Sequence, residues 1–339
     1  MKFGVFDHMD KSAMSLADQY DSRLRLAQAY DRAGFHAYHL AEHHSTPLGV
    51  TPSPSVYLAA VIQRTQRLRV GPMVYTLSMH HPLRVLEEIC MLDQMSRGRL
   101  EVGLGRGVSP YEIRYYGVDP EQAQSIYQES YQIIMQGLTE AEVNFSGRHF
   151  QLQHVPVEMQ CYQKPTPPIW YGLGTPQGAR WVAENRINII CNGTVPHVRA
   201  ITDSYRQAWR DLGRDAQSLP LMGVSRHIVI GDSRRAAQES AAQAYKLWHR
   251  HLLHLWVKHG ARSASLPFPE EFEAAQEAGL AMAGTADEVR DWVEAQVESM
   301  GVNYFVCRFA FGSMSHEDSL RTVELFASEV APALQEKVQ

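Results

Sequence analysis

The chain has 339 residues, of which 45% are hydrophobic and 20% charged, a composition typical of a folded globular protein. The formal net charge is −5 and no block of Lys or Arg stands out, so neither a nucleic acid nor a membrane surface is expected as a partner. The four cysteines form no CxxC pair, no apolar leader opens the chain and no apolar run approaches about 18 residues, so we expect a soluble, cytoplasmic protein.

Short apolar runs alternate with amphipathic stretches along most of the chain. Strands are predicted over residues 3–6, 37–41, 68–74, 99–104, 169–173, 187–191, 221–230 and 302–308. Helices are predicted over residues 16–33, 55–65, 82–95, 120–139, 176–185, 195–211, 233–259, 287–299 and 317–333. A small hairpin is expected over 144–152, with its turn at Ser146-Gly147, and residues 260–283 show poor periodicity.

This alternation predicts an α/β fold in which eight strands form a (β/α)8 TIM barrel as one domain over residues 1–339. The competing architecture is a doubly wound open sheet. That fold usually has fewer strands and a Gly-rich first turn, and the stretch from Gly4 to His8 is not such a turn.

The second predicted strand is followed at once by Glu42, His43 and His44. Barrel enzymes present their catalytic groups at the C-terminal ends of the strands, and histidine exchanges protons near neutral pH. Two adjacent histidines cannot both point into one pocket, so one is expected to be catalytic and the other structural. The alternative is that both are loop histidines that cap backbone carbonyls.

Other histidines raise the question of a metal site. His80 and His81 follow the third strand, and together with Glu42 they include residue types that bind zinc. HExxH spacing is absent and no later strand ends in an obvious ligand, so no metal site is predicted. A solvated or subunit-facing helix surface is expected for His249, His251, His254 and His259.

Two glycine-containing turns suggest a phosphate site. Gly103-Leu104-Gly105-Arg106-Gly107 ends the fourth strand, where glycines let a ligand approach and Arg106 offers donors to phosphate. Gly172-Leu173-Gly174-Thr175-Pro176 ends the fifth strand and opens a helix, with Thr175 as N-cap. The alternative is that the first stretch is only a tight βα turn and the second only a structural helix cap, with no ligand at either.

These residues, in this order, resemble the bacterial luciferase-like flavin monooxygenases over nearly the whole chain. The most specific string is Leu92-Asp93-Gln94-Met95-Ser96-Arg97-Gly98-Arg99. The other matching stretches are Gly34-Phe35, Glu42-His43-His44, Val70-Gly71, His81-Pro82, Gly105-Arg106-Gly107, Gly284-Thr285-Ala286-Asp287-Glu288-Val289 and Leu325-Phe326-Ala327-Ser328-Glu329-Val330-Ala331-Pro332.

The resemblance implies a TIM barrel that is usually dimeric through the helices following the second and third strands. It implies reduced FMN as cosubstrate, often delivered by a separate NAD(P)H-dependent flavin reductase. Oxygen would add to the flavin to give a C4a-peroxyflavin, which oxidises a small organic substrate.

The resemblance also implies roles for particular residues. His43 would be the acid or base beside the flavin, oriented by Glu42 and His44. The Met73-Val74 bond would be a non-proline cis peptide beneath the flavin ring. Phosphate would be held by Arg106 and Gly107 and by the turn of Gly172, Gly174 and Thr175. Residues 260–283 would form a lid after the seventh strand.

The chain also departs from luciferase itself. Gly174-Thr175 replaces a Glu-Ser pair and Gly105 replaces a reactive cysteine, so light emission is not expected and a homodimer is favoured. A deazaflavin-dependent dehydrogenase and a noncatalytic flavin-binding protein remain the alternatives, ahead of a metal-dependent hydrolase. The expected substrate pocket is aromatic and partly apolar, with Phe6, His8, Tyr75, Tyr111, Tyr115 and Arg308.

Overall fold

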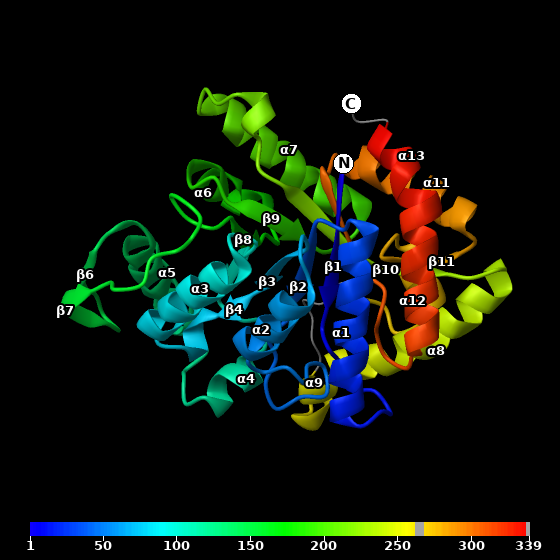
Figure 1. The fold of residues 1–339 in the computed structure, drawn as a ribbon, viewed down its shortest axis with the longest axis horizontal. Helices are drawn as coiled ribbons and strands as arrows, with labels where there is room; N and C mark the ends of the chain where they lie inside the picture. The colour runs from blue at the N-terminus through cyan, green and yellow to red at the C-terminus, as the bar shows by residue number, and fades with distance from the viewer. Residues whose placement is uncertain (262–267, 337–339) are drawn as a thin grey trace.

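The computed structural model describes residues 1–261 and 268–336 (Figure 1). Within these residues, a parallel barrel is formed by eight strands. They are β1 (Lys2–Asp7), β2 (Ala37–Leu40), β3 (Arg69–Pro72), β5 (Val102–Gly105), β8 (Ile169–Gly172), β9 (Asn188–Cys191), β10 (Met222–Ile230) and β12 (Tyr304–Arg308). The predicted TIM barrel is confirmed.

The strands follow the order β3-β2-β1-β12-β10-β9-β8-β5, and the two ends of this sheet meet. Val70 of β3 forms a parallel bridge with Leu100, and the short strand β4 (Tyr75–Thr76) pairs with β5. Because all barrel strands are parallel, their C-terminal ends lie at one rim. Every side chain that follows a strand is therefore brought to the same edge.

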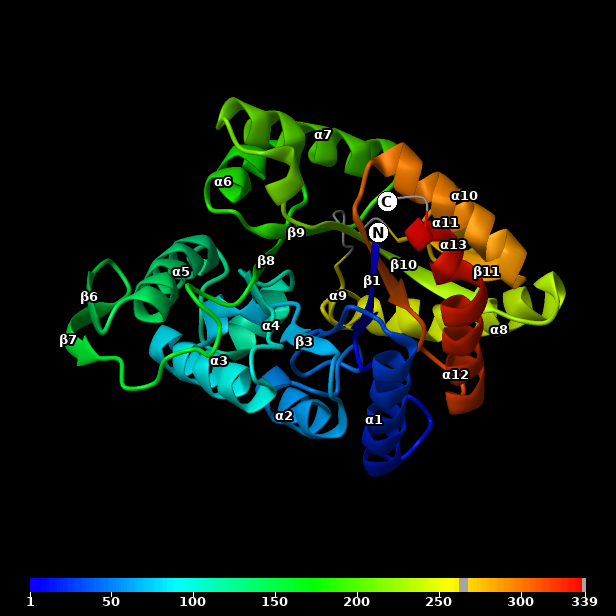
Figure 2. The ribbon, with the colours of Figure 1, turned by 45° about the horizontal axis from the view of Figure 1, so that its top comes forward.

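Helices surround the barrel, as the two ribbon views show (Figures 1 and 2). They are α1 (Leu16–Ala33), α2 (Pro54–Arg64), α3 (Pro82–Ser96), α4 (Pro110–Tyr115), α5 (Ala123–Thr139), α6 (Ala179–Glu184), α7 (Val195–Asp211), α8 (Arg234–Leu252), α9 (His254–Lys258), α10 (Phe272–Glu277), α11 (Ala286–Met300), α12 (His316–Leu325) and α13 (Ala331–Glu336). Local sequence fixes several ends: the Ser15 side chain caps α1, and Gly34, with φ of +79°, terminates it. None of the described helices combines the length and apolarity needed to span a membrane.

Several elements differ from the sequence prediction. The six residues of α4 were not predicted, and the long helix expected over 233–259 breaks at Leu253 into α8 and α9. The expected hairpin exists as β6 (Glu142–Ser146) and β7 (Gln151–Pro156), but its turn is longer than two residues.

The segment expected as a lid is partly regular. Residues 262–267 lie outside the described part of the chain. The remainder of this poorly periodic stretch contains α10 and the strand β11 (Ala281–Gly284), which pairs with β10. The lid itself stays a prediction.

The third predicted strand ends early, at Pro72, and is followed by a cis peptide bond between Met73 and Val74. The cis bond was predicted and is confirmed. Gly105 lies against this segment, since a Cβ at that position would come within 2.3 Å of Val74 Cγ2. The missing side chain of Gly105 thus leaves room for Val74, and Gly105 also lines the rim cavity.

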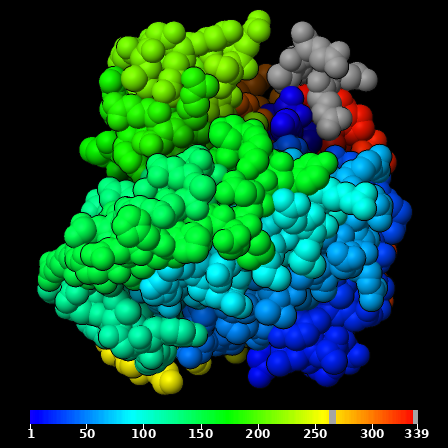
Figure 3. Space-filling model, turned by 60° about the vertical axis from the view of Figure 1, so that its left-hand side comes forward, coloured from blue at the N-terminus to red at the C-terminus, as the bar shows by residue number. Residues whose placement is uncertain are grey.

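The hairpin and the segment after it cover one side of the molecule. Figure 3 shows this green segment lying against the cyan surface of α3. Gln94 of α3 donates a hydrogen bond to the carbonyl of Gln160 (2.8 Å), and the Sγ atoms of Cys90 and Cys161 lie 3.6 Å apart. All four cysteines are buried free thiols.

Candidate functional site

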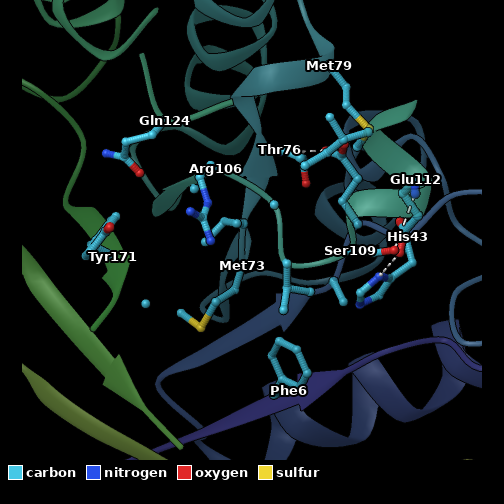
Figure 4. Close-up of a pocket in the computed structure, with 18 of the residues that line it drawn as sticks. Phe6, His43, Met73, Thr76, Met79, Arg106, Ser109, Glu112, Gln124 and Tyr171 are labelled. Atoms are coloured by element: carbon cyan, nitrogen blue, oxygen red, sulfur yellow. Dashed lines mark hydrogen bonds and ion pairs between the residues drawn. The ribbon is translucent and has the colours of Figure 1, made fainter. Parts of the chain in front are cut away.

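A cavity of about 570 Å³ opens at the C-terminal rim of the barrel (Figure 4). The residues that line it end or follow β1, β2, β3, β5 and β8, or come from the helices above the rim. They are Phe6, Ala41, Glu42, His43, Met73, Val74, Thr76, Met79, Gly105, Arg106, Gly107, Val108, Ser109, Glu112, Ile113, Gln124, Tyr171, Gly172 and Thr175. This volume lies within the range of roughly 300–1,000 Å³ that small-molecule and cofactor sites occupy.

At one end of the cavity, His43 is held by a carboxylate that the sequence did not reveal. Glu112 Oε1 lies 3.2 Å from His43 Nδ1, and Glu112 Oε2 accepts a hydrogen bond from the backbone N–H of His44 (2.7 Å). An ionised carboxylate only accepts hydrogen bonds, so in the neutral imidazole the proton lies on Nδ1. The ring is thereby left with an unprotonated Nε2, which can accept a proton.

Glu112 reaches this position because α4 begins beside the cavity. Ser109 caps the helix by accepting from the backbone N–H of Glu112 (3.3 Å), and Pro110 occupies the first helical position. These residues are a recognisable helix start. A six-residue helix is too short to show a hydrophobic period, so this helix start is the local signal by which the sequence marks α4.

Glu42 anchors a second hydrogen-bond network beside the cavity. Its Oε1 lies 2.9 Å from His44 Nε2 and 2.8 Å from His80 Nε2, while His44 Nδ1 lies 2.7 Å from the Tyr116 hydroxyl. The expectation that Glu42 and His44 orient His43 is corrected here, because they bond to each other and Glu112 holds the His43 ring. His44 does not line the cavity.

The same network bears on the metal question. Potential ligand atoms of Glu42, His44 and His80 lie within 4.8 Å of one another. Both histidine Nε2 atoms already lie at hydrogen-bonding distance from one carboxylate oxygen, which describes a His–Glu–His network that is partly buried. His81 is separate from it: its Nδ1 accepts from the Leu83 backbone N–H at the start of α3.

The network gives the protein a stability contribution that depends on pH. Burial opposes charge on both groups, yet their hydrogen bond and mutual attraction raise the pKa of His80 and lower the pKa of Glu42. A raised histidine pKa stabilises the fold fully below its unfolded value of about 6.5, and the contribution is lost as the pH rises through the folded value. We therefore expect the thermal midpoint of the wild type to fall above pH 6.5 by more than that of His80→Gln.

Thermal unfolding at a series of pH values, with His81→Gln as the matched control, tests this expectation. His81 caps a helix start and has no carboxylate partner among the described residues. Parallel pH profiles for the wild type and His80→Gln would contradict it.

The other end of the cavity is cationic. Figure 4 shows Arg106, Gln124 and Tyr171 gathered there, away from His43 and Glu112. Within the described residues no carboxylate pairs with the guanidinium of Arg106, which is exposed. Its positive charge is thus available to an anionic group.

The turn after β8 adds polar groups at this cationic end. Thr175 lines the cavity, and the expected N-cap bond is not formed, so its hydroxyl has no hydrogen-bond partner in the described part of the chain. No atom lies within 4 Å of a Cβ built at Gly172 or Gly174, so open space adjoins both residues. Gly174 itself is outside the cavity lining.

The other predicted pocket residues are divided by the structure. Phe6 lines the cavity, and the imidazole of His8 stacks on that of His43 with ring centroids 5.8 Å apart. Tyr75, by contrast, is directed away and bonds to Ser55 (2.6 Å).

Tyr111 and Tyr115 also lie outside the cavity lining, because both contact His259.

The expectation that the histidines of the long helix lie on its surface is wrong for His249. This residue is buried, with its Nε2 3.2 Å from the Phe268 carbonyl.

Sequence comparison relates the chain to flavin-dependent oxygenases. Residues 1–304 match the model of the luciferase-like monooxygenase family. The chain is 42% identical to protein y4wF of Sinorhizobium fredii, covering 97% of this chain and 96% of that protein. It is 26% identical to the oxygenase component of flavin-dependent trigonelline monooxygenase of Acinetobacter baylyi, over 99% and 96%.

Solved structures share the fold. Monooxygenase RslO1 of Streptomyces bottropensis superposes with a TM-score of 0.89 at 25% identity, covering 98% of this chain and 100% of that one. The oxygenating constituent of 3,6-diketocamphane monooxygenase of Pseudomonas putida, in complex with FMN, has a TM-score of 0.81 at 19% identity, over 98% of each chain. The F420-dependent tetrahydromethanopterin reductase of Methanopyrus kandleri has a TM-score of 0.70 at 17% identity, over 98% and 99%. The chain therefore belongs to the luciferase-like monooxygenase family of flavin-dependent oxidoreductases.

Proposed function

We propose that the protein is an FMN-dependent monooxygenase that uses reduced flavin and O2 to oxidise a small organic substrate. The observation that carries this proposal is the polarity of the rim cavity, with an unpaired arginine at one end and the His43–Glu112 pair at the other. FMN carries an anionic phosphate at the end of a ribityl chain and a flat ring system at the other end, and such a molecule matches a cavity with one cationic end. When bound, reduced FMN supplies the electrons for the activation of O2.

The residues of the cavity divide into two roles. Arg106, Gly107 and the turn of Gly172, Gly174 and Thr175 would hold the phosphate, while Met73 and Val74 would support the ring. His43 would move a proton at Nε2, with Glu112 as its positioning residue. The buried walls would keep bulk water away from the reacting atoms.

An external reductase and a homodimer are further parts of this proposal. The relationship to a protein described as an oxygenase component supports delivery of flavin by a separate NAD(P)H-dependent reductase. Exposed apolar side chains on α2 and α3, namely Val56, Met91 and Met95, support dimerisation through these helices. The mass of the protein in solution tests the dimer directly.

The phosphate assignment makes a prediction that does not need the substrate. We expect Arg106→Ala to weaken the binding of reduced FMN by about 10- to 100-fold, since one charge-assisted hydrogen bond is lost. Riboflavin has the same ring without the phosphate, so its affinity should be unchanged. Anaerobic titration of both flavins measures the difference.

The matched control is Arg114→Ala, which removes an exposed arginine of α4 outside the cavity lining. An equal loss of affinity for both flavins would mean that Arg106 supports the cavity instead of the phosphate.

The oxygenase proposal itself is tested by adding oxygenated buffer to the complex with reduced FMN and screening for compounds whose oxidation depends on O2. The deazaflavin alternative predicts no binding of reduced FMN and an oxygen-independent reaction with the deazaflavin. The noncatalytic alternative predicts tight flavin binding without oxidation of any compound in the screen.

A further inference from the structure

Arg308 is a buried arginine at the rim of the barrel, outside the cavity lining. It is the last residue of β12 and pairs in register with His227 of β10. Side chains alternate along a strand, and Tyr304 and Val306 belong to the apolar cluster inside the barrel. Arg308 has the same parity, so its side chain also enters the barrel interior, one layer nearer the rim.

The guanidinium of Arg308 is poorly satisfied. The residue is 3% exposed, and the single hydrogen bond of its side chain within the described chain joins Nη2 to Asn192 Oδ1 at 3.3 Å. Nε and Nη1 have no partner among the described residues, and no carboxylate there pairs with the charge. A buried cation without a counterion is strongly unfavourable, so this arrangement requires an explanation.

Arg226, one residue from His227 on β10, shows what a structural arginine looks like in this protein. It is equally buried, but all three of its side-chain nitrogens are bonded, to the Gln296 side chain and to the carbonyls of Ser225 and Gly193. The two arginines are therefore similarly buried, but they differ in how many of their side-chain nitrogens form hydrogen bonds.

The surroundings of Arg308 are aromatic. Its Cζ lies 5.1, 5.6 and 5.3 Å from the ring centroids of Phe6, Trp248 and Phe268. Phe6 also lines the rim cavity, so its ring adjoins both the guanidinium and the flavin-sized space. The Phe6 ring is therefore the side chain that contacts both the cavity and Arg308.

Two histidines complete the cluster without adding negative charge. Both ring nitrogens of His227 are buried and unpartnered among the described residues. His8 Nδ1 accepts from the Trp248 indole N–H (3.2 Å), which defines a neutral tautomer with its proton on Nε2. Burial lowers the pKa of Arg308 to about 10, so the guanidinium stays charged at neutral pH.

We propose that Arg308 binds the anionic group of the substrate, and that the substrate is a small organic carboxylate with an apolar, ring-containing body. That the bound anion is a substrate rests on the proposed oxygenase function. The binding of an anion beside Arg308 does not depend on flavin. The carboxylate would supply the missing counterion, and the aromatic rings of Phe6, Trp248 and Phe268 would contact the body of the molecule.

The test uses benzoate as an anionic probe and benzamide as its neutral counterpart, on flavin-free protein in a zwitterionic buffer without added salt. Benzoate is expected to raise the thermal midpoint of the wild type in a saturable manner, while benzamide is not. Arg308→Met is expected to lose roughly 10- to 100-fold in affinity for benzoate, because a charge-assisted contact is removed.

Stability provides a second, independent readout. Arg308→Met removes an uncompensated buried charge, so its thermal midpoint without ligand should lie above that of the wild type. Arg226→Met, the matched control, removes a satisfied arginine and should lower the midpoint. Arg308→Lys keeps a positive charge and should retain weakened benzoate binding.

The proposal is overturned if benzoate does not bind the wild type at millimolar concentration, if benzamide binds as well, or if Arg308→Met retains full affinity. Lower stability of Arg308→Met than of the wild type would likewise show a structural arginine. Titration of the wild type with reduced FMN separates the two proposals: benzoate binding without FMN binding leaves the anion site standing and removes the oxygenase function.

Discussion

Replacing His43 with Gln is expected to lower the rate of substrate oxidation by about 10²–10⁴-fold, the usual contribution of a positioned acid or base. His43 lines the cavity, and its Nδ1–H is directed to Glu112, which leaves Nε2 as the acceptor. Glutamine retains a polar side chain but cannot exchange a proton near neutral pH. The cavity should therefore persist while proton transfer is lost.

The measurement is single-turnover product formation with reduced FMN and O2, using a substrate found by the screen. Affinity for reduced FMN should change little, because the cationic end of the cavity is untouched. His81→Gln is the control, since this neighbouring histidine contacts the start of α3 and not the cavity. Wild-type turnover in His43→Gln would exclude His43 from catalysis.

The barrel was predictable because its signals are local. The barrel strands coincide with mainly apolar runs, and caps such as Ser15 and Gly34 mark helix ends. The strand β11 gave no such signal. Its sequence Ala281–Gly284 is rich in small residues with weak strand preference, and it is a strand because it pairs with β10.

The candidate site was predictable only where its residues follow strands directly. Glu42, His43 and Arg106 do so, and all three line the cavity. Glu112 and Gln124 lie on helices α4 and α5, and the contact between Glu112 and His43 joins residues 69 positions apart. No local pattern encodes such a contact, since it depends on how α4 packs above the rim.

Arg308 illustrates a different limit. Its position at a strand end suggested a pocket residue, but the sequence cannot tell whether the guanidinium nitrogens of an arginine have hydrogen-bond partners. Arg226 and Arg308 both lie on barrel strands. The acceptors of the Arg226 hydrogen bonds include residues in other parts of the chain, such as Gln296 and Gly193. Only the folded arrangement separates their roles.

Glu112→Gln is expected to lower the rate of substrate oxidation nearly as much as the loss of His43, although it changes a single atom type. The backbone N–H of His44 can only donate, so the glutamine carbonyl oxygen must face it and keep that hydrogen bond. The amide nitrogen must then face His43 Nδ1 and donate to it. The imidazole proton is forced onto Nε2, the atom proposed as proton acceptor, and a wrong tautomer of this kind can cost up to about 10⁴-fold in kcat.

Comparison with Glu112→Ala separates this positioning role from a structural one. Alanine removes both contacts and leaves a buried N–H unpaired, which should lower the free energy of unfolding by about 1–3 kcal/mol. Glutamine should leave the thermal midpoint and the affinity for reduced FMN near those of the wild type, while kcat alone falls. If Glu112→Gln instead turns over at the wild-type rate and only Glu112→Ala is impaired, the carboxylate serves to hold the turn after β2, and the His43 tautomer is set by something other than Glu112.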